Sequence, residues 1–218
     1  MSRAALLLCL LAIAAPAQKK SAPAKPQPAK SQPSKTAPVP EPEPVPTPSD
    51  LGLKALEAKD YPAAIASFEQ AIAGDDTDYA AQFHLALAHS LAGHAEPAIA
   101  HYRKALQLKS GLYEAEINLG LLLFQTKDYA GAEPHLKAAA EKKPENATAV
   151  AAHGRCLLEL NRLAEAEPVL RKAAALDASQ KDTLLGLAQR YEDAKQVDQA
   201  IALYKEFPNT PGVTERLG

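Results

Sequence analysis

The sequence predicts an all-α fold: an α-solenoid of helix-turn-helix repeats preceded by a disordered, proline-rich segment. Two observations lead to this prediction. A pattern of small and large residues returns every 34 residues through residues 45–218, and a fixed period of this length is typical of stacked helical repeats. Ten of the 18 prolines fall within residues 18–48, a segment with too few large apolar side chains to form a core.

Residues 1–17 have the features of a secretory signal peptide. Arg3 precedes the apolar stretch Ala4–Ala17, which ends in the small-residue site Ala15-Pro16-Ala17. This order of charge, apolar stretch and small residues predicts cleavage after Ala17. Cleavage after Ala14, or retention as an anchor, stays open, although 14 apolar residues are fewer than the ~20 that span a bilayer. We therefore expect an exported protein, periplasmic or secreted, either free or retained at the cell envelope.

Residues 18–48 form the predicted disordered linker. Its basic part contains five lysines, Lys19, Lys20, Lys25, Lys30 and Lys35, before Glu41 and Glu43. Proline spacing of this kind favours an extended tether. The tether is either a simple spacer or a weak contact for anionic envelope polymers or lipid.

The remaining chain repeats one pattern five times without insertions. A small residue is followed twelve residues later by Ala, four residues after that by a large apolar residue, and three residues further on by another Ala. The small residues are Gly52, Ala86, Gly120, Gly154 and Ala188; the first Ala residues are Ala64, Ala98, Ala132, Ala166 and Ala200; the large ones are Phe68, Tyr102, Leu136, Leu170 and Tyr204; the last are Ala71, Ala105, Ala139 and Ala173, with Phe207 as the exception. Spacings of four and seven lie on one face of a helix. Small residues there allow two helices to approach closely.

This pattern resembles the tetratricopeptide repeat family. The resemblance covers a domain at residues 49–218, in units near 45–78, 79–112, 113–146, 147–180 and 181–214. The family's Trp is absent, and its closing Pro appears only as Pro144. The resemblance implies a right-handed superhelix whose first helices line a concave groove.

Prolines and the C-terminus supply further expectations. Pro62 and Pro97 are predicted at second-helix starts, and Pro134 and Pro168 within the first turn of theirs. Residues 210–218 are either a short capping turn or the beginning of a sixth unit.

The sequence contains no pattern that indicates catalysis, a metal site or a cofactor. The closest spacings among the six histidines are five and seven, whereas a helical ligand pair requires i, i+4. Cys156 is predicted to be buried and unreactive, and His153, which stands where the other repeats have Leu, to be packed in the core. A net charge of −2 and 5% aromatic residues do not favour nucleic-acid binding. The chain is therefore predicted not to be an enzyme.

The predicted function is that of a protein–protein interaction scaffold. The groove positions implied by the resemblance include an apolar series that suits an amphipathic helix or an extended apolar segment; the alternative is that these side chains pack in the core. The candidate groove residues are Phe83, His84, Leu87, Ile117, Asn118, Leu121, Phe124 and Arg155. The alternative function is a structural envelope protein that contacts wall polymer or membrane through its basic tether.

Overall fold

The computed structural model describes residues 45–208, 210 and 212–217. The chain divides into two units, residues 1–43 and 44–218, and the described helices belong to the second. The predicted signal peptide and nearly all of the predicted linker lie outside the described residues. The described part contains helices and turns and no strand.

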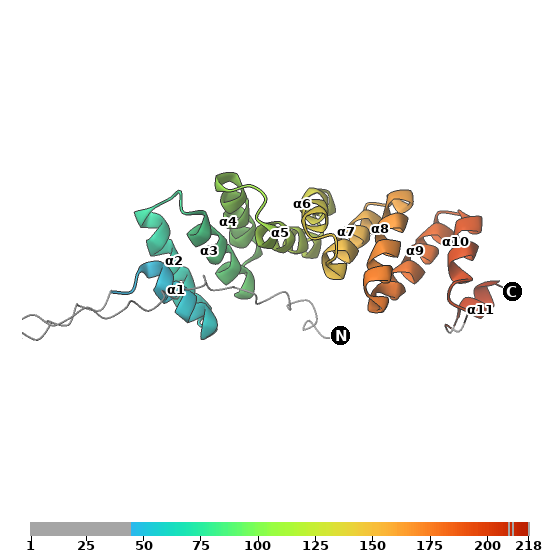
Figure 1. The fold of residues 1–218 in the computed structure, drawn as a ribbon, viewed down its shortest axis with the longest axis horizontal. Helices are drawn as coiled ribbons and strands as arrows, with labels where there is room; N and C mark the ends of the chain where they lie inside the picture. Colours follow the sequence, from blue (N-terminus) through green and yellow to red (C-terminus); the bar gives the residue numbers. More distant parts are fainter. Residues whose placement is uncertain (1–44, 209, 211, 218) are drawn as a thin grey trace, which may run out of the picture. The chain divides into compact units, whose positions relative to one another are not determined.

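The helices alternate as first and second members of successive pairs (Figure 1). The first helices are α1 (Pro48–Glu57), α3 (Tyr79–Leu91), α5 (Tyr113–Gln125), α7 (Ala147–Glu159) and α9 (Asp182–Asp193). The second helices are α2 (Tyr61–Gly74), α4 (Ala95–Leu108), α6 (Tyr129–Lys142), α8 (Leu163–Leu176) and α10 (Val197–Tyr204). A 3₁₀ turn, η1 (Ala178–Lys181), precedes α9, and a short helix, α11 (Val213–Leu217), follows α10.

Each pair packs only against its neighbours. The two helices of a pair contact one another, and each second helix contacts the first helix of the next pair. First helices also contact each other, α1 with α3, α5 with α7, and α7 with α9, whereas no two second helices of the described part are as close. The first helices therefore lie on the inner side of the stack. This nearest-neighbour packing is that of an α-solenoid, which confirms the predicted fold class.

The repeated small and large residues explain the close helix pairs. A Cβ added to Gly120 of α5 would lie 2.7 Å from Leu136 Cγ on α6. A Cβ on Gly154 would meet Leu170 Cδ2 at 2.5 Å, and one on Gly52 would meet the Phe68 ring at 2.7 Å. The large residues are completely buried, so each fills the space that the missing side chain leaves.

Each first helix ends in the same left-handed turn. Lys59, Gly93, Lys127, Asn161 and Lys195 occupy one repeat position, and all have φ between 57° and 83°. At each turn the next N–H donates to the carbonyl five residues back, as His94 N does to His89 O at 2.9 Å. This pairing is the Schellman motif, which satisfies carbonyls at a helix end. The turn reverses the chain direction, so the second helix runs back alongside the first.

The expectation for two prolines is wrong. Pro62 and Pro97 do lie in the first turns of α2 and α4, but Pro134 and Pro168 lie in the interior of α6 and α8. Both second helices begin earlier than the proline suggests, at Tyr129 and Leu163. A proline at the sixth helical position removes one backbone hydrogen bond, and in both cases its ring is exposed.

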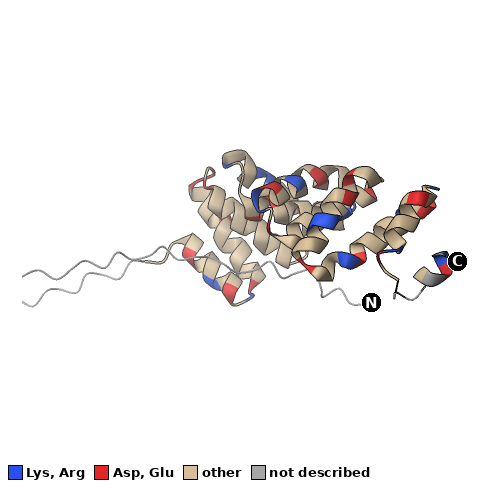
Figure 2. Cartoon of the chain, turned by 45° about the vertical axis from the view of Figure 1, so that its right-hand side comes forward, with Lys and Arg blue, Asp and Glu red and all other residues tan. Residues whose placement is uncertain are grey.

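Charge is unevenly distributed along the stack (Figure 2). Helix α3 has no Lys, Arg, Asp or Glu, and α2 has only Glu69. Helix α8, by contrast, carries Glu165, Glu167, Arg171 and Lys172.

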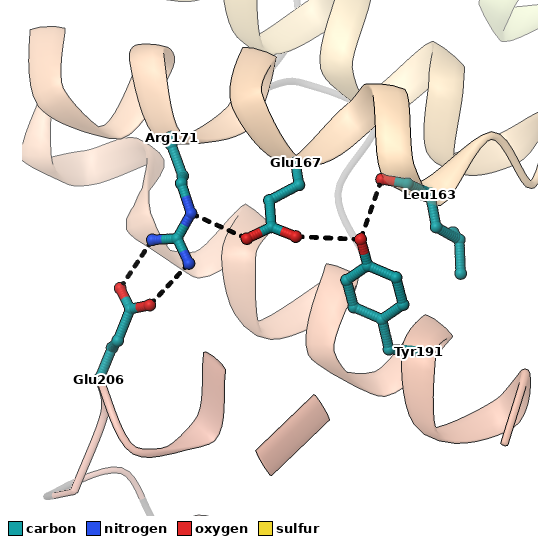
Figure 3. Close-up of polar contacts among 5 residues, drawn as sticks. All are labelled: Leu163, Glu167, Arg171, Tyr191 and Glu206. Carbon is teal, nitrogen blue, oxygen red and sulfur yellow. Dashed lines mark hydrogen bonds and ion pairs between the residues drawn. The ribbon is translucent and has the colours of Figure 1, made fainter. Parts of the chain in front are cut away.

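The charges of α8 connect the last two repeats (Figure 3). Arg171 donates two hydrogen bonds to Glu206, at 3.0 and 2.7 Å, and one to Glu167 at 3.0 Å. Glu167 also accepts from the Tyr191 hydroxyl of α9 at 3.0 Å. Because Glu206 follows the end of α10, this network ties α8 to both helices of the following repeat.

Helix α11 covers part of the last repeat. Val213 is 4% exposed and belongs to the apolar cluster of α8, α9 and α10. Arg216 donates to Glu192 and to the Tyr204 hydroxyl. Pro211, the residue predicted to start a capping turn, lies outside the described residues.

Candidate functional site

The candidate surface is the inner face formed by the first helices. The structure places the eight predicted groove residues on three of them. Phe83, His84 and Leu87 lie on α3; Ile117, Asn118, Leu121 and Phe124 lie on α5; Arg155 lies on α7. Six of the eight are half-buried, Ile117 is buried and Arg155 is exposed.

Aromatic rings connect α3 to its neighbours. His84 stacks on Phe68 of α2 with 5.4 Å between ring centroids, and Phe83 meets His84 edge-on at 5.2 Å. Phe83 also lies 5.8 Å from the Tyr102 ring of α4. Burial lowers the pKa of His84, although Asp78 opposes the shift. The α3 face is therefore apolar and, at neutral pH, uncharged.

The half-buried apolar residues differ in how much the core depends on them. Phe83, Leu121 and Phe124 pack against the main apolar cluster, and Phe124 also meets Tyr129 edge-on at 5.1 Å. Leu87 is half-buried but belongs to none of the described clusters. Leu87 is therefore the apolar groove residue on which the described core clusters depend least.

Ile117 serves the core rather than the surface. It is 2% exposed and belongs to the main apolar cluster. The position implied by the family resemblance is on the groove. However, α5 packs against both α4 and α7. The residue at the same repeat position on α7, Ala151, is buried as well. The accessible apolar surface on α5 therefore consists of Leu121 and Phe124.

Polar and charged pairs also lie on the inner face at α7 and α9. Arg155 donates to the Gln180 side chain at 3.2 Å, and Arg190 of α9 pairs with Glu159 of α7 at 3.0 Å. Each pair has one exposed and one half-buried member. A partner that lies along α3, α5, α7 and α9 would therefore meet apolar side chains on α3 and α5 and these polar pairs on α7 and α9.

Two polar bridges between helices were not anticipated. Gln82 on α3 bonds His101 on α4 at 2.8 Å, and Glu116 on α5 bonds His135 on α6 at 2.6 Å. Both pairs are 19 residues apart, and they are related by the 34-residue period. The sequence signal for these bridges was a pair of polar residues with the same offset in two adjacent repeats. The corresponding pairs Val150 and Val169, and Leu184 and Leu203, are apolar.

The described residues offer little for catalysis. No three of their His, Cys, Asp or Glu side chains are grouped to hold a metal ion. Cys156 is buried, its thiol contacts the Tyr129 carbonyl at 3.3 Å, and burial raises its pKa to about 11. At neutral pH the thiol is protonated and therefore a poor nucleophile.

His153 is packed, as predicted. It is 9% exposed, and its Nε2 lies 3.5 Å from Glu133 Oε1 without forming an aligned hydrogen bond. None of the described helices is long and apolar enough to cross a membrane.

Comparison with known proteins agrees with this architecture. Family models described as tetratricopeptide repeat match residues 49–112 and 123–177, which together exceed half of the chain. No curated protein sequence matches significantly. Among solved structures, YrrB, described as a TPR protein with an unusual peptide-binding site, has a TM-score of 0.67 and 17% identity over 75% of this chain and 87% of that one.

Structures of MamA are similar to the same degree. A MamA double mutant has a TM-score of 0.64 and 18% identity over 78% of this chain and 92% of that one. MamA AMB-1 has a TM-score of 0.65 and 24% identity over 78% and 94%. At these identities the likeness concerns the fold alone. The family models and the stacked helix pairs together show that the chain belongs to the tetratricopeptide repeat family.

Proposed function

We propose that this protein is an exported, non-catalytic scaffold of the cell envelope that binds an apolar partner segment against α3 and α5. The tetratricopeptide repeat fold supports protein–protein interaction, with protein or peptide partners. The observation that carries the finer proposal is the set of apolar side chains on α3 and α5, Phe83, Leu87, Leu121 and Phe124, which remain partly accessible beside a helix α3 that has no Lys, Arg, Asp or Glu.

The chemistry of this face selects an apolar segment. Burying apolar surface contributes about 25 cal/mol per Å², and α3 has no charged side chain that binding would desolvate. An amphipathic helix or extended segment can present alternate apolar side chains to such a face. The peptide-binding site described for YrrB, which has the same fold, supports a peptide partner here.

The sharpest test is the substitution Leu87→Asp. Since Leu87 lies outside the described core clusters, the change should leave the fold intact while placing a charge on the proposed face. The matched control is Leu176→Asp, because Leu176 is 43% exposed on the second helix α8. Both variants of the full chain are used to capture proteins from envelope extract, with circular dichroism to confirm folding.

A partner retained by the wild type and by Leu176→Asp, but lost with Leu87→Asp, is the expected result. The partner's binding segment, synthesised as a peptide, should then bind the wild type directly. Retention by all three proteins would place the contact elsewhere and overturn the proposed face.

The export part of the proposal rests on residues 1–17 and the tether. N-terminal sequencing of the protein isolated from its native envelope should begin at Gln18; an intact Met1 would contradict cleavage. The alternative function rests on the five tether lysines. If it holds, replacing all five by Gln should abolish sedimentation with wall polymer or anionic vesicles, while Leu87→Asp should not affect it.

A further inference from the structure

Three histidines gather where α3 turns into α4. His89 lies in the last turn of α3, and His94 directly precedes α4. Their Nδ1 atoms are 3.3 Å apart. The His89 ring also stacks in parallel on His101 of α4, with 5.8 Å between centroids and 6° between planes.

The backbone holds the first two histidines together. Gly93 adopts φ of 83°, and His94 N donates to His89 O at 2.9 Å. The two residues are thus the ends of one hydrogen-bonded turn, and this turn fixes the distance between their backbones. His94 is the N-cap residue of α4, but its side chain makes no capping bond. Its ring is exposed.

Neighbouring groups orient His89 and place a negative charge near it. His101 Nδ1–H donates to the Oε1 atom of the buried Gln82 at 2.8 Å, and this bond holds the ring on which His89 stacks. The carboxylate of Glu69 acts electrostatically on both His89 and His101, and a negative charge beside the cluster favours a bound cation.

We propose that His89 and His94 bind a divalent transition-metal ion of the Zn²⁺ class through their Nδ1 atoms. With Zn–N distances of about 2.0–2.1 Å and tetrahedral angles, two ligand nitrogens are separated by about 3.3–3.4 Å. The observed separation of 3.3 Å matches this value. In the metal-free protein the two nitrogens share one proton in a hydrogen bond; rotation of the exposed His94 ring redirects its lone pair to the ion.

Water completes the coordination. Among the described residues no third His, Cys, Asp or Glu side chain is grouped with the pair, and the parallel stacking of His101 keeps its lone pair in a different plane from that of His89. The site thus has two protein ligands and open positions. Such a site would join the two helices of the second repeat on an exposed turn, away from the cores of the array.

The test is calorimetric titration of the metal-free full chain with ZnCl₂ at neutral pH. One saturable site is expected, with affinity reduced at least tenfold in His89→Asn and in His94→Asn. The matched control is His135→Gln, which removes a half-buried histidine at an equivalent second-helix position while retaining a donor to Glu116. This control should bind as the wild type does.

A second measurement does not depend on whether the variants fold. In the wild type, nitrogen NMR of the imidazoles should show zinc-dependent shifts of Nδ1 in His89 and His94 and none in His153. Absence of saturable binding to the wild type would overturn the proposal. So would unchanged affinity in both Asn variants, or shifts confined to other histidines, because the pair would then be only a hydrogen bond.

Discussion

Single glycines determine how closely the helices of a repeat approach. At Gly120 a Cβ would lie 2.7 Å from Leu136 side-chain atoms and 3.1 Å from the Leu136 backbone nitrogen. The Leu136 side chain is fully buried, and the backbone cannot move without shifting α6. Gly186 of α9 is different, since nothing lies within 4 Å of the position that a Cβ would occupy there.

These two glycines make a matched pair of predictions. Gly120→Ala should destabilise the protein by about 1–3 kcal/mol, as overpacking of a core does. Gly186→Ala should stabilise it by about 0.5–1 kcal/mol, because Ala is the better residue in a helix interior. Urea unfolding followed by circular dichroism measures both. Equal effects of the two substitutions would show that helix propensity, and not the α5–α6 contact, determines how Gly120→Ala changes the stability.

His153 is a polar residue at a core position. In the other repeats the same position holds Leu51, Leu85, Leu119 and Leu187. Burial lowers the pKa of His153 below its ordinary value of 6.5, while Glu133 opposes the shift. The folded protein therefore holds this proton less tightly than the unfolded chain. The stability that depends on neutral His153 is present above pH 6.5 and is lost as the pH falls towards the folded-state pKa.

The substitution His153→Leu should remove part of this acid sensitivity. It also removes a buried Nε2 that has no hydrogen-bond partner among the described residues, a defect that costs about 1–3 kcal/mol. Glu133 keeps its ion pair with Arg162 at 3.4 Å. Unfolding free energies measured on both sides of the histidine titration, in mildly alkaline and in mildly acidic buffer, should show a gain at both and a larger gain in acid. A gain that does not depend on pH would assign the acid sensitivity to the other histidines.

At the scale of elements, the interior prolines of α6 and α8 are the feature that the sequence pattern misplaced. The sequence alone does not distinguish a proline in the first turn from one in the second turn, because only Asp128 or Arg162 marks the start of the helix. Asp128 caps α6 by accepting from Gly131 N at 2.9 Å, and this cap decides the start. At Pro134 the carbonyl of Ala130 has no N–H to accept from four residues ahead.

Replacing the interior proline should therefore stabilise the protein. Pro134→Ala restores the missing N–H and removes the ring from the helix interior, where proline is unfavourable by about 3 kcal/mol relative to Ala. Two effects reduce this gain: the native helix already accommodates the ring, and Ala raises the conformational entropy of the unfolded chain, which costs up to about 1 kcal/mol of stability. We therefore expect a net gain in stability of about 1–2 kcal/mol. Pro62→Ala, in the first turn of α2, should give no gain. Thermal unfolding of both variants makes the comparison, and a gain at Pro62 as large as at Pro134 would contradict it.

The period predicted the elements well and the site only in part. Helix pairs, their turns and the buried Gly120–Leu136 contact follow from spacing, because a period of 34 residues places the same contacts in every repeat. Exposure does not follow from spacing alone: Ile117 and Leu87 occupy groove positions, yet one is buried and the other is not. The meeting of His89 and His94 depends on a left-handed turn at Gly93, which converts an unpromising spacing of five into a contact.

At the scale of the whole array, stability depends on contacts between neighbouring repeats and is therefore local. The core of the described residues divides into four clusters, which lie around Phe68 and Leu85, around Leu119 and Leu136, around Val150 and Ala173, and around Leu170 and Leu187. In such an array each interface between repeats makes its own contribution to the free energy of unfolding. The first and last described repeats have one neighbour instead of two. Leu51 at the first repeat is accordingly 46% exposed and Val197 at the last is 55% exposed.

The last prediction concerns how α11 protects the C-terminal end of this array. Val213→Asp places a charge in the cluster formed with Leu203 and Tyr204, so α11 should detach and α9 and α10 should open more often. Hydrogen exchange followed by mass spectrometry should show faster exchange in residues 182–204 and unchanged exchange in residues 79–108. Glu215→Ala, at an exposed position of the same short helix, should leave both regions unchanged. Faster exchange in α3 and α4 as well would mean that the array opens as one cooperative unit, because local opening confined to one end cannot expose helices three repeats away.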